Sequence, residues 1–180
     1  MRKPVAFIII TGLVAALFFA FYQKHEKAQS QTVTNIHTIG MAWRKWRQDE
    51  WRFRGPKLIR ISAPTPRYDA VRFTIYDEKG RTLGEPRFIR MSYDEVYQML
   101  VRQNQGGYLE DVPRTDGWGR ELEFYRNPDV FGQNSILIRS PGRDGVYSGK
   151  IYTQGAYGKG RFDKDIVWMD DAFIQLPKSK

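Results

Sequence analysis

Cysteine is absent from the 180-residue sequence, and histidine occurs twice, at His25 and His37. The absence of cysteine excludes disulfide bonds and thiolate chemistry, although it fits several cellular compartments. The sequence also lacks a G-x-S-x-G nucleophile elbow and a P-loop. Both histidines fall in a predicted N-terminal helix, far in sequence from the acidic residues of the C-terminal third. We therefore expect no enzymatic activity.

Charge is absent from residues 5–22, which are almost entirely apolar. A helix of this length reaches about 27 Å, enough to cross the hydrocarbon core of a bilayer. A cleavable signal peptide would end in small residues, whereas this run ends in Phe18-Phe19-Ala20-Phe21-Tyr22. A buried core helix is less expected than a membrane span, because the run is apolar on every face and sits at the extreme N-terminus. We predict that residues 1–22 form an uncleaved membrane anchor.

Positive charges flank this run on both sides, with Arg2 and Lys3 before it and Lys24 and Lys27 after it. The N-terminal amine favours a cytoplasmic N-terminus, which leaves the following residues outside. The net charge of +9 includes seven Lys or Arg between residues 23 and 54. Such a basic stretch next to a bilayer can contact anionic lipid headgroups. We expect no nucleic-acid partner, because a membrane anchor disfavours that interpretation of the charge.

A long helix is predicted to continue from the anchor through residues 23–54, since no proline occurs between Tyr22 and Pro56. Residues 29–32 are polar and are predicted to be exposed or frayed. Further along, apolar side chains recur at helical spacing and predict a face that docks on a domain. Packing is the expected role of the tryptophans in this region. The residues concerned are Ile36, Ile39, Trp43, Trp46 and Trp51.

Residues 55–180 are predicted to form an α+β domain. Ser92 and Glu95 form the capping pattern S-x-x-E, which predicts a helix over residues 93–104 that ends at Gly106-Gly107. The segment 147–160 contains four glycines and is predicted to be a loop. Alternating or β-branched residues predict strands at 57–61, 70–76, 87–91, 122–125, 135–139, 165–168 and 172–174.

Four short motifs follow one another in the C-terminal third: P-R-T-D-G-W-G at 113–119, F-Y at 124–125, I-R-S-P-G-R-D-G at 138–145 and D-K-D-I-V-W at 163–168. This series resembles the C-terminal domain of the major pseudopilin of type II secretion systems, over residues 112–168. The resemblance implies a helix whose first half lies in the bacterial inner membrane. The outer half would pack on a small antiparallel sheet in the periplasm, in the plan of pilins and pseudopilins.

The resemblance also implies a calcium ion that fixes the last loops. Asp144 matches the aspartate of the family's turn, and Asp163 or Asp165 matches its later acidic ligand, with backbone carbonyls near residues 138–139 and 146. Calcium accepts six to eight oxygen ligands, so carboxylates and carbonyls of two loops could share one. The alternative is an ordinary tight turn at Asp144-Gly145, with Asp163 and Asp165 as solvated loop residues near several lysines and arginines.

The N-terminus departs from the family pattern. Gly12 is followed by Leu13 where the family has glycine and phenylalanine, and no acidic residue precedes Glu26. Peptidase processing and glutamate-based registration of subunits are therefore not expected. The expected function is that of a membrane-anchored structural component of a type II secretion or pilus-like apparatus. It would contact lipid through residues 5–22 and other secretion-apparatus or pseudopilin-like proteins.

Self-association stays open at the level of sequence. Gly12, Ala15 and Ala16 would allow two helices to approach closely within a membrane. The alternative function is a binding module that does not polymerise and engages an envelope partner. Such a module would use the basic and aromatic segment 147–162, although its tyrosines are expected to pack on an edge strand.

Overall fold

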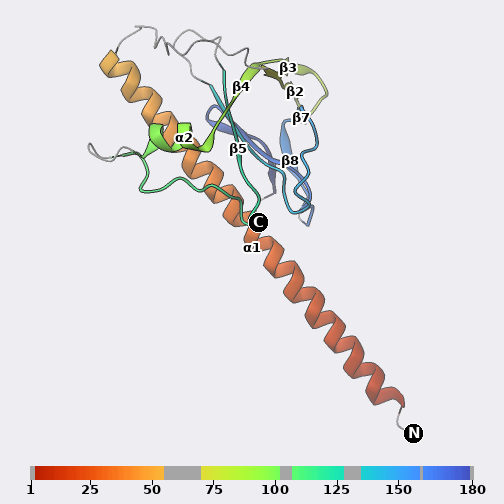
Figure 1. Cartoon of the computed structure of the whole chain (residues 1–180). Coiled ribbons are helices and arrows are strands. Elements are labelled where there is room, and N and C mark those ends of the chain that lie inside the picture. The colour runs from red at the N-terminus through yellow and green to blue at the C-terminus, as the bar shows by residue number, and fades with distance from the viewer. Residues whose placement is uncertain (1–2, 55–69, 102–106, 128–134, 159, 179–180) are drawn as a thin grey trace.

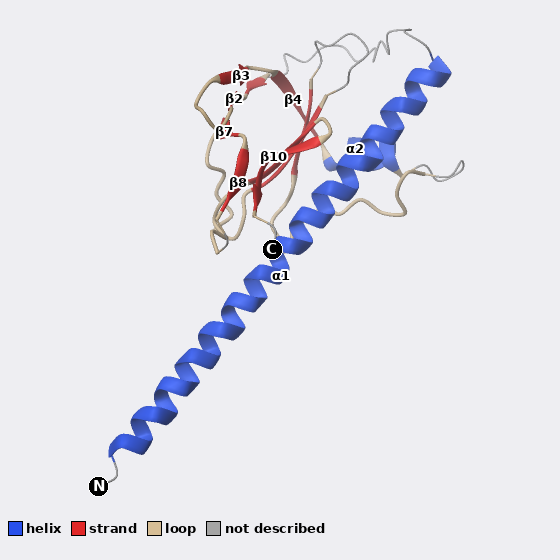
Figure 2. Ribbon diagram, turned by 180° about the vertical axis from the view of Figure 1, so that it is seen from behind, coloured by secondary structure: helices blue, strands red, loops and turns tan. Residues whose placement is uncertain are grey.

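The computed structural model describes residues 3–54, 70–101, 107–127, 135–158 and 160–178, with the side chains of residues 11–49 in the first range. The protein is α+β, with one long N-terminal helix, α1 (Lys3–Arg54), and sheets that are mostly antiparallel. The second half of α1 packs on the sheet, whereas its first half extends alone away from the domain (Figure 1). The short helix α2 (Tyr93–Leu100) lies across α1 (Figure 2).

The docked half of α1 carries the apolar face that the sequence predicts. Ile36, Ile39, Trp43 and Trp46 are buried, so their predicted packing is confirmed. The side chain of Trp51 lies outside the described residues. At Gly40 a Cβ would stand 2.5 Å from the indole of Trp168, so the absence of a side chain lets the helix lie directly on the sheet.

The projecting half of α1 is exposed along its whole described length, residues 11–20. The side chains of residues 5–10, within the predicted anchor, lie outside the described part of the chain. Among the residues that the structure describes, no helix combines the length and the apolar character needed to cross a membrane.

A seven-stranded sheet runs in the order β1-β4-β5-β6-β9-β10-β8, and a three-stranded sheet in the order β3-β2-β7. Within the described ranges, the strand pairings are antiparallel except for β10 with β8 and β2 with β7, which are parallel. The strands are β1 (Val71–Arg72), β2 (Thr74–Tyr76), β3 (Thr82–Gly84), β4 (Arg87–Met91), β5 (Glu123–Arg126), β6 (Ile136–Ser140), β7 (Ile151–Thr153), β8 (Gly155–Tyr157), β9 (Ile166–Met169) and β10 (Ala172–Pro177).

Apolar clusters lie on both faces of the large sheet. Ile136 and Ile138 of β6 join Trp43 of α1 and Leu100 of α2 in the helix-side cluster. The side chain of Leu137 points to the opposite face of the sheet. It belongs to a second cluster with Phe73, which lies between β1 and β2, and Tyr152 of β7. All five residues of β6 are buried, because the strand is covered on both faces.

The sequence predicts six of these strand regions, five of them to within about one residue, while β10 continues three residues beyond the predicted 172–174. Residues 70–76 divide into β1 and β2, which join different sheets. The prediction of a strand at 57–61 lies outside the described residues. The prediction of a plain loop over 147–160 is wrong, because this segment contains β7 and β8. Both strands have three residues, and glycines flank them, so no alternation is visible in the sequence.

The predicted helix after Ser92 is confirmed as α2. The Glu95 backbone N–H donates to the Ser92 hydroxyl at 3.2 Å, and the Ser92 backbone N–H donates to the Glu95 carboxylate at 2.7 Å. This reciprocal capping satisfies two backbone donors that the first turn leaves without helical partners. The predicted extension beyond residue 101 lies outside the described part of the chain.

Candidate functional site

The loop over residues 113–121 is organised around one buried carboxylate, Asp116. Its Oδ1 accepts the backbone N–H groups of Trp118 and Arg120, at 2.9 Å each. Its Oδ2 accepts the hydroxyl of Ser140, at the end of β6, at 2.6 Å. A carboxylate that accepts several hydrogen bonds fixes the shape of its loop. Sequence reasoning did not identify Asp116, although it stands in the P-R-T-D-G-W-G motif.

This loop docks on α1 through polar contacts with the first buried turn of the helix. The backbone N–H of Gly117 donates to the Thr32 hydroxyl at 2.8 Å, and Asn35 donates to the carbonyl of Thr115 at 3.2 Å. The predicted exposure or fraying of residues 29–32 is therefore wrong for Gln29 and Thr32, which are buried. The polar character of Thr32 reflects its contact with the loop and not with solvent.

His25 lies at the end of the same contact. The indole Nε1 of Trp118 donates to its Nδ1 at 3.1 Å, and the ring of Phe21 packs edge-on at 4.2 Å. Burial lowers the pKa of His25, and the positive charges of Arg143 and Lys24 lower it further. A neutral imidazole suits this contact, because Nδ1 accepts the indole proton. The role of this histidine is therefore to join α1 to the loop.

The three acidic residues assigned to calcium have different surroundings. The Asp144 carboxylate is exposed and accepts the backbone N–H of Val146 at 3.0 Å. Asp163 forms a bidentate ion pair with Arg143, whose Nε and Nη2 donate to its two carboxylate oxygens at 2.7 Å each. Asp165 is fully buried and accepts the hydroxyl of Tyr152 at 2.8 Å and two donors of Ser148.

This donor set does not fit a calcium ion in the arrangement described. Both oxygens of Asp163 and both oxygens of Asp165 already accept protein hydrogen bonds. Over the described ranges, no group of three or more His, Cys, Asp or Glu residues could hold a metal ion. Calcium stays a prediction of the resemblance. The Asx turn at Asp144 agrees with the alternative of an ordinary tight turn.

A buried polar network joins these loops to the sheet and was not predicted. Its centre is Arg139 of β6, whose Nε donates to Glu123 at 2.7 Å. Nη2 of Arg139 donates to the hydroxyl of Tyr125 at 3.0 Å, and Nη1 donates to Tyr152 at 2.9 Å. Tyr152 in turn donates to Asp165. The sequence signal was an arginine directly after the apolar run Ile136-Leu137-Ile138, since such a residue needs acidic and hydroxyl partners when buried.

Burial has the largest effect on the pKa values of Tyr125 and Asp165 in this network. It raises the pKa of Tyr125 to about 12, with help from the hydrogen bond to Glu123. Burial also raises the pKa of Asp165, whereas the hydrogen bonds from Tyr152 and Ser148 lower it. The network therefore stabilises the arrangement of β5, β6 and the segment 147–165. Its arginine and tyrosines are turned into the protein and away from solvent, which suits a structural role.

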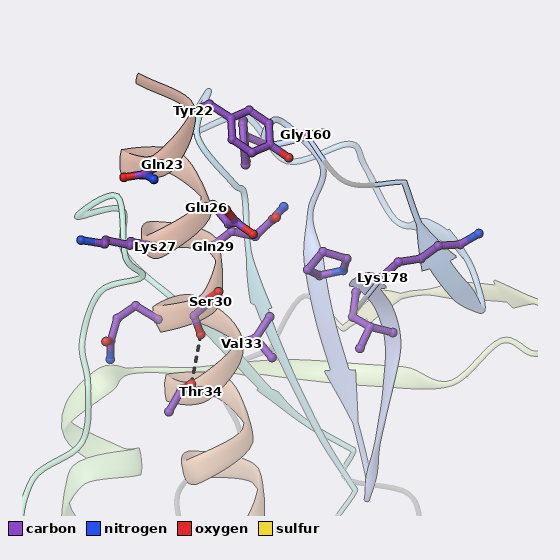
Figure 3. A pocket seen from close by; sticks show the side chains of 14 residues that line it. Tyr22, Gln23, Glu26, Lys27, Gln29, Ser30, Val33, Thr34, Gly160 and Lys178 are labelled. Atoms are coloured by element: carbon purple, nitrogen blue, oxygen red, sulfur yellow. Dashed lines mark hydrogen bonds between the residues drawn. The ribbon is translucent and has the colours of Figure 1, made fainter. Parts of the chain in front are cut away.

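Two grooves flank α1 where it leaves the domain. One, of about 930 Å³, lies between α1 and the end of β10, and its lining includes Tyr22, Val33 and Phe162. Figure 3 shows Tyr22 beside Gly160 at its mouth, while Lys27 points to the other side of the helix. There, α1 and the loops at Trp118 and Arg143 enclose a second groove of about 780 Å³, which we call the basic groove.

No protein-family model, no curated protein and no solved structure matches this chain. The function is therefore argued from the geometry of α1, the loops that hold it and the two grooves.

Proposed function

We propose that the protein is a pseudopilin-like, membrane-anchored structural component of a type II secretion or pilus-like apparatus. Residues 5–22 would cross the bacterial inner membrane once, with the N-terminus cytoplasmic and the C-terminal domain periplasmic. The observation that carries this proposal is the form of α1. One continuous helix is held by the domain along its second half and projects from it along its first half (Figure 1).

The side chains of the projecting half support an apolar environment around it. Leu13, Val14, Leu17, Phe18 and Phe19 each expose between 59% and 70% of their surface. A contiguous apolar surface of this kind is costly in water and marks a contact with lipid or protein. The uncharged sequence of residues 5–22 extends the same character toward the N-terminus.

The attachment of α1 to the domain supports a structural role. Gly40 lies against Trp168, Gly117 lies against the backbone of Ala28, and Thr32 accepts a hydrogen bond from the loop. These contacts cover more than one turn of α1 and leave little freedom for the domain to pivot. A subunit of this kind would transmit the position of its anchor to the surface of its domain.

One observation favours the alternative of a binding module that engages an envelope partner. Val146 and Ile151 each expose 64% of their surface in the segment between β6 and β8. Lys150 stands between them. Exposed apolar residues with a neighbouring cation fit a docking surface for a protein partner.

Disulfide crosslinking in native membranes separates the two functions, because the natural chain has no cysteine. Leu13→Cys and Leu17→Cys each place one thiol on the projecting half, and Lys79→Cys places one in an exposed turn of the domain as a control. A structural subunit predicts crosslinked dimers for the first two variants and monomers for the control. Monomers for all three, together with co-purification of an envelope protein that depends on Ile151, would favour the binding module.

A further inference from the structure

The basic groove brings together cations from three separate parts of the chain. Lys24 and Lys27 come from α1, Arg120 from the loop after Asp116, and Arg143 from the loop after β6. None of the described residues that line this groove is acidic. Asp163 lies outside the lining and pairs with Arg143, so it offsets part of that charge. The groove nevertheless keeps a clear excess of positive charge.

The titration of His25 supports this excess. His25 also lines the groove, and Arg143 and Lys24 both act to lower its pKa, in addition to burial. The negative charge of Asp163 raises the pKa of His25, but this effect is smaller than those of burial, Arg143 and Lys24. A ligand with negative charge would therefore find a favourable field there.

The loops that form the groove are fixed in place before any ligand binds. The Arg120 backbone N–H donates to Asp116, and its guanidinium reaches the carbonyl of Arg143 at 3.5 Å. Trp118 is held by its bond to His25. A preformed site loses less conformational entropy on binding than a mobile one.

The position of the groove matches the depth of lipid headgroups. Lys24 and Lys27 follow the proposed membrane boundary at residue 22 by about 3 and 8 Å along the helix axis. The headgroup region of one leaflet is roughly 5–8 Å thick. Aromatic side chains gather at the same level, with Phe21 near Arg143 and Tyr22 against Phe162. Aromatic residues beside cations are typical of a membrane interface.

We propose that the basic groove binds the phosphate headgroup of an anionic phospholipid in the leaflet that faces the domain. This inference rests on the proposed membrane anchor and adds a specific lipid contact to it. The phosphate would lie between Lys27 and Arg120, with the acyl chains along α1 below Ala20. The bound lipid would fix the height and tilt of the domain above the membrane.

Native mass spectrometry of the full-length chain, extracted in mild detergent and mixed with equal amounts of phosphatidylglycerol and phosphatidylcholine, tests this proposal. The expected result is one phosphatidylglycerol adduct in preference to phosphatidylcholine. Lys27→Gln/Arg120→Gln should lower that adduct at least about fivefold, because one cation near an anionic lipid contributes roughly that factor. Lys164→Gln/Lys178→Gln removes the same charge near the same end of the domain but outside the groove, and should retain it.

The absence of a preference for phosphatidylglycerol would overturn the inference. An equal loss in both double variants would indicate diffuse attraction and would overturn it as well. Full displacement of the lipid by excess glycerol phosphate would show a site for a soluble anion and would also overturn it. Membrane fractionation of the wild-type chain separates this test from the proposed function. A membrane-bound protein without lipid preference contradicts the inference alone, whereas a chain absent from membranes contradicts both.

Discussion

Gly117 lies against the carbonyl group of Ala28 on α1 with no space for a side chain between them. A Cβ at residue 117 would overlap that carbonyl oxygen, and the backbone N–H of Gly117 donates to Thr32 one turn further along the helix. The loop and the helix are thus in direct backbone contact. This contact joins the helix to the domain close to the point where its projecting half begins.

The substitution Gly117→Ala tests this contact. We expect the free energy of unfolding to fall by about 1–3 kcal/mol, because the added methyl group forces the loop away from α1. Gly84→Ala is the matched control, since its Cβ would meet no atom closer than 3.8 Å. The control should leave stability unchanged or raise it by up to about 1 kcal/mol. Equal effects of both substitutions in chemical denaturation would contradict a close contact at Gly117.

The mostly buried ion pair of Arg139 and Glu123 gives a second prediction. Arg139→Met should lower the free energy of unfolding by about 3–5 kcal/mol, because it leaves the Glu123 carboxylate without its buried cationic partner. Arg90 also pairs with Glu123, at 3.0 Å, but is mostly exposed, so Arg90→Met should cost less than about 1 kcal/mol. The double variant Glu123→Gln/Arg139→Met should recover part of the loss. A similar cost for both single variants would contradict a central role for Arg139.

The buried tyrosines predict a loss of stability at alkaline pH. Burial raises the pKa of Tyr125 to about 12, and it also raises the pKa of Tyr147 and Tyr152. These groups keep their protons in the folded protein while the unfolded chain loses them above about pH 10. The free energy of unfolding should therefore fall as the pH rises from about 10 through 12.

Tyrosine ionisation, followed by absorbance together with the melting temperature, checks this prediction. Part of the phenolate signal should appear only as the protein unfolds, since the buried hydroxyls ionise with the unfolding transition. Ionisation of all ten tyrosines near pH 10 in a protein that remains folded would contradict it.

Calcium removal is the test of the calcium prediction. Because Arg143 and Tyr152 supply donors to Asp163 and Asp165, we expect EDTA to leave the melting temperature unchanged. Arg143→Gln should lower the melting temperature only slightly, because the ion pair with Asp163 is partly exposed and screened by solvent. A melting temperature that falls with EDTA, recovers with calcium and loses this response in Asp144→Ala would establish the calcium site instead.

The sequence predicts those parts of the fold whose signals are local. The capping residues Ser92 and Glu95 lie three positions apart, and the docked face from Ile36 to Trp46 repeats at helical spacing. The strand β6 begins with the apolar run Ile136-Leu137-Ile138, which is typical of a strand that is buried on both faces. Such features need no knowledge of distant contacts.

The remaining features depend on partners far along the chain. Thr32 is buried because it meets Gly117, 85 residues later, and a polar residue on a helix otherwise indicates an exposed face. The strand β7 pairs in parallel with β2, so its three residues carry no hairpin signal. The pairing of Arg143 with Asp163 joins two loops, and the sequence alone equally allows an ion between them.

The central claim is that residues 5–22 hold the protein in a membrane. Alkaline carbonate extraction of the full-length chain tests it most directly, with Leu13→Lys/Leu17→Lys to disrupt the anchor and Leu83→Lys as an exposed control in the domain. If these residues span the bilayer, the wild-type chain and Leu83→Lys stay in the membrane pellet, while the double variant is released. Release of the wild-type chain together with the double variant would show that residues 5–22 do not anchor the protein.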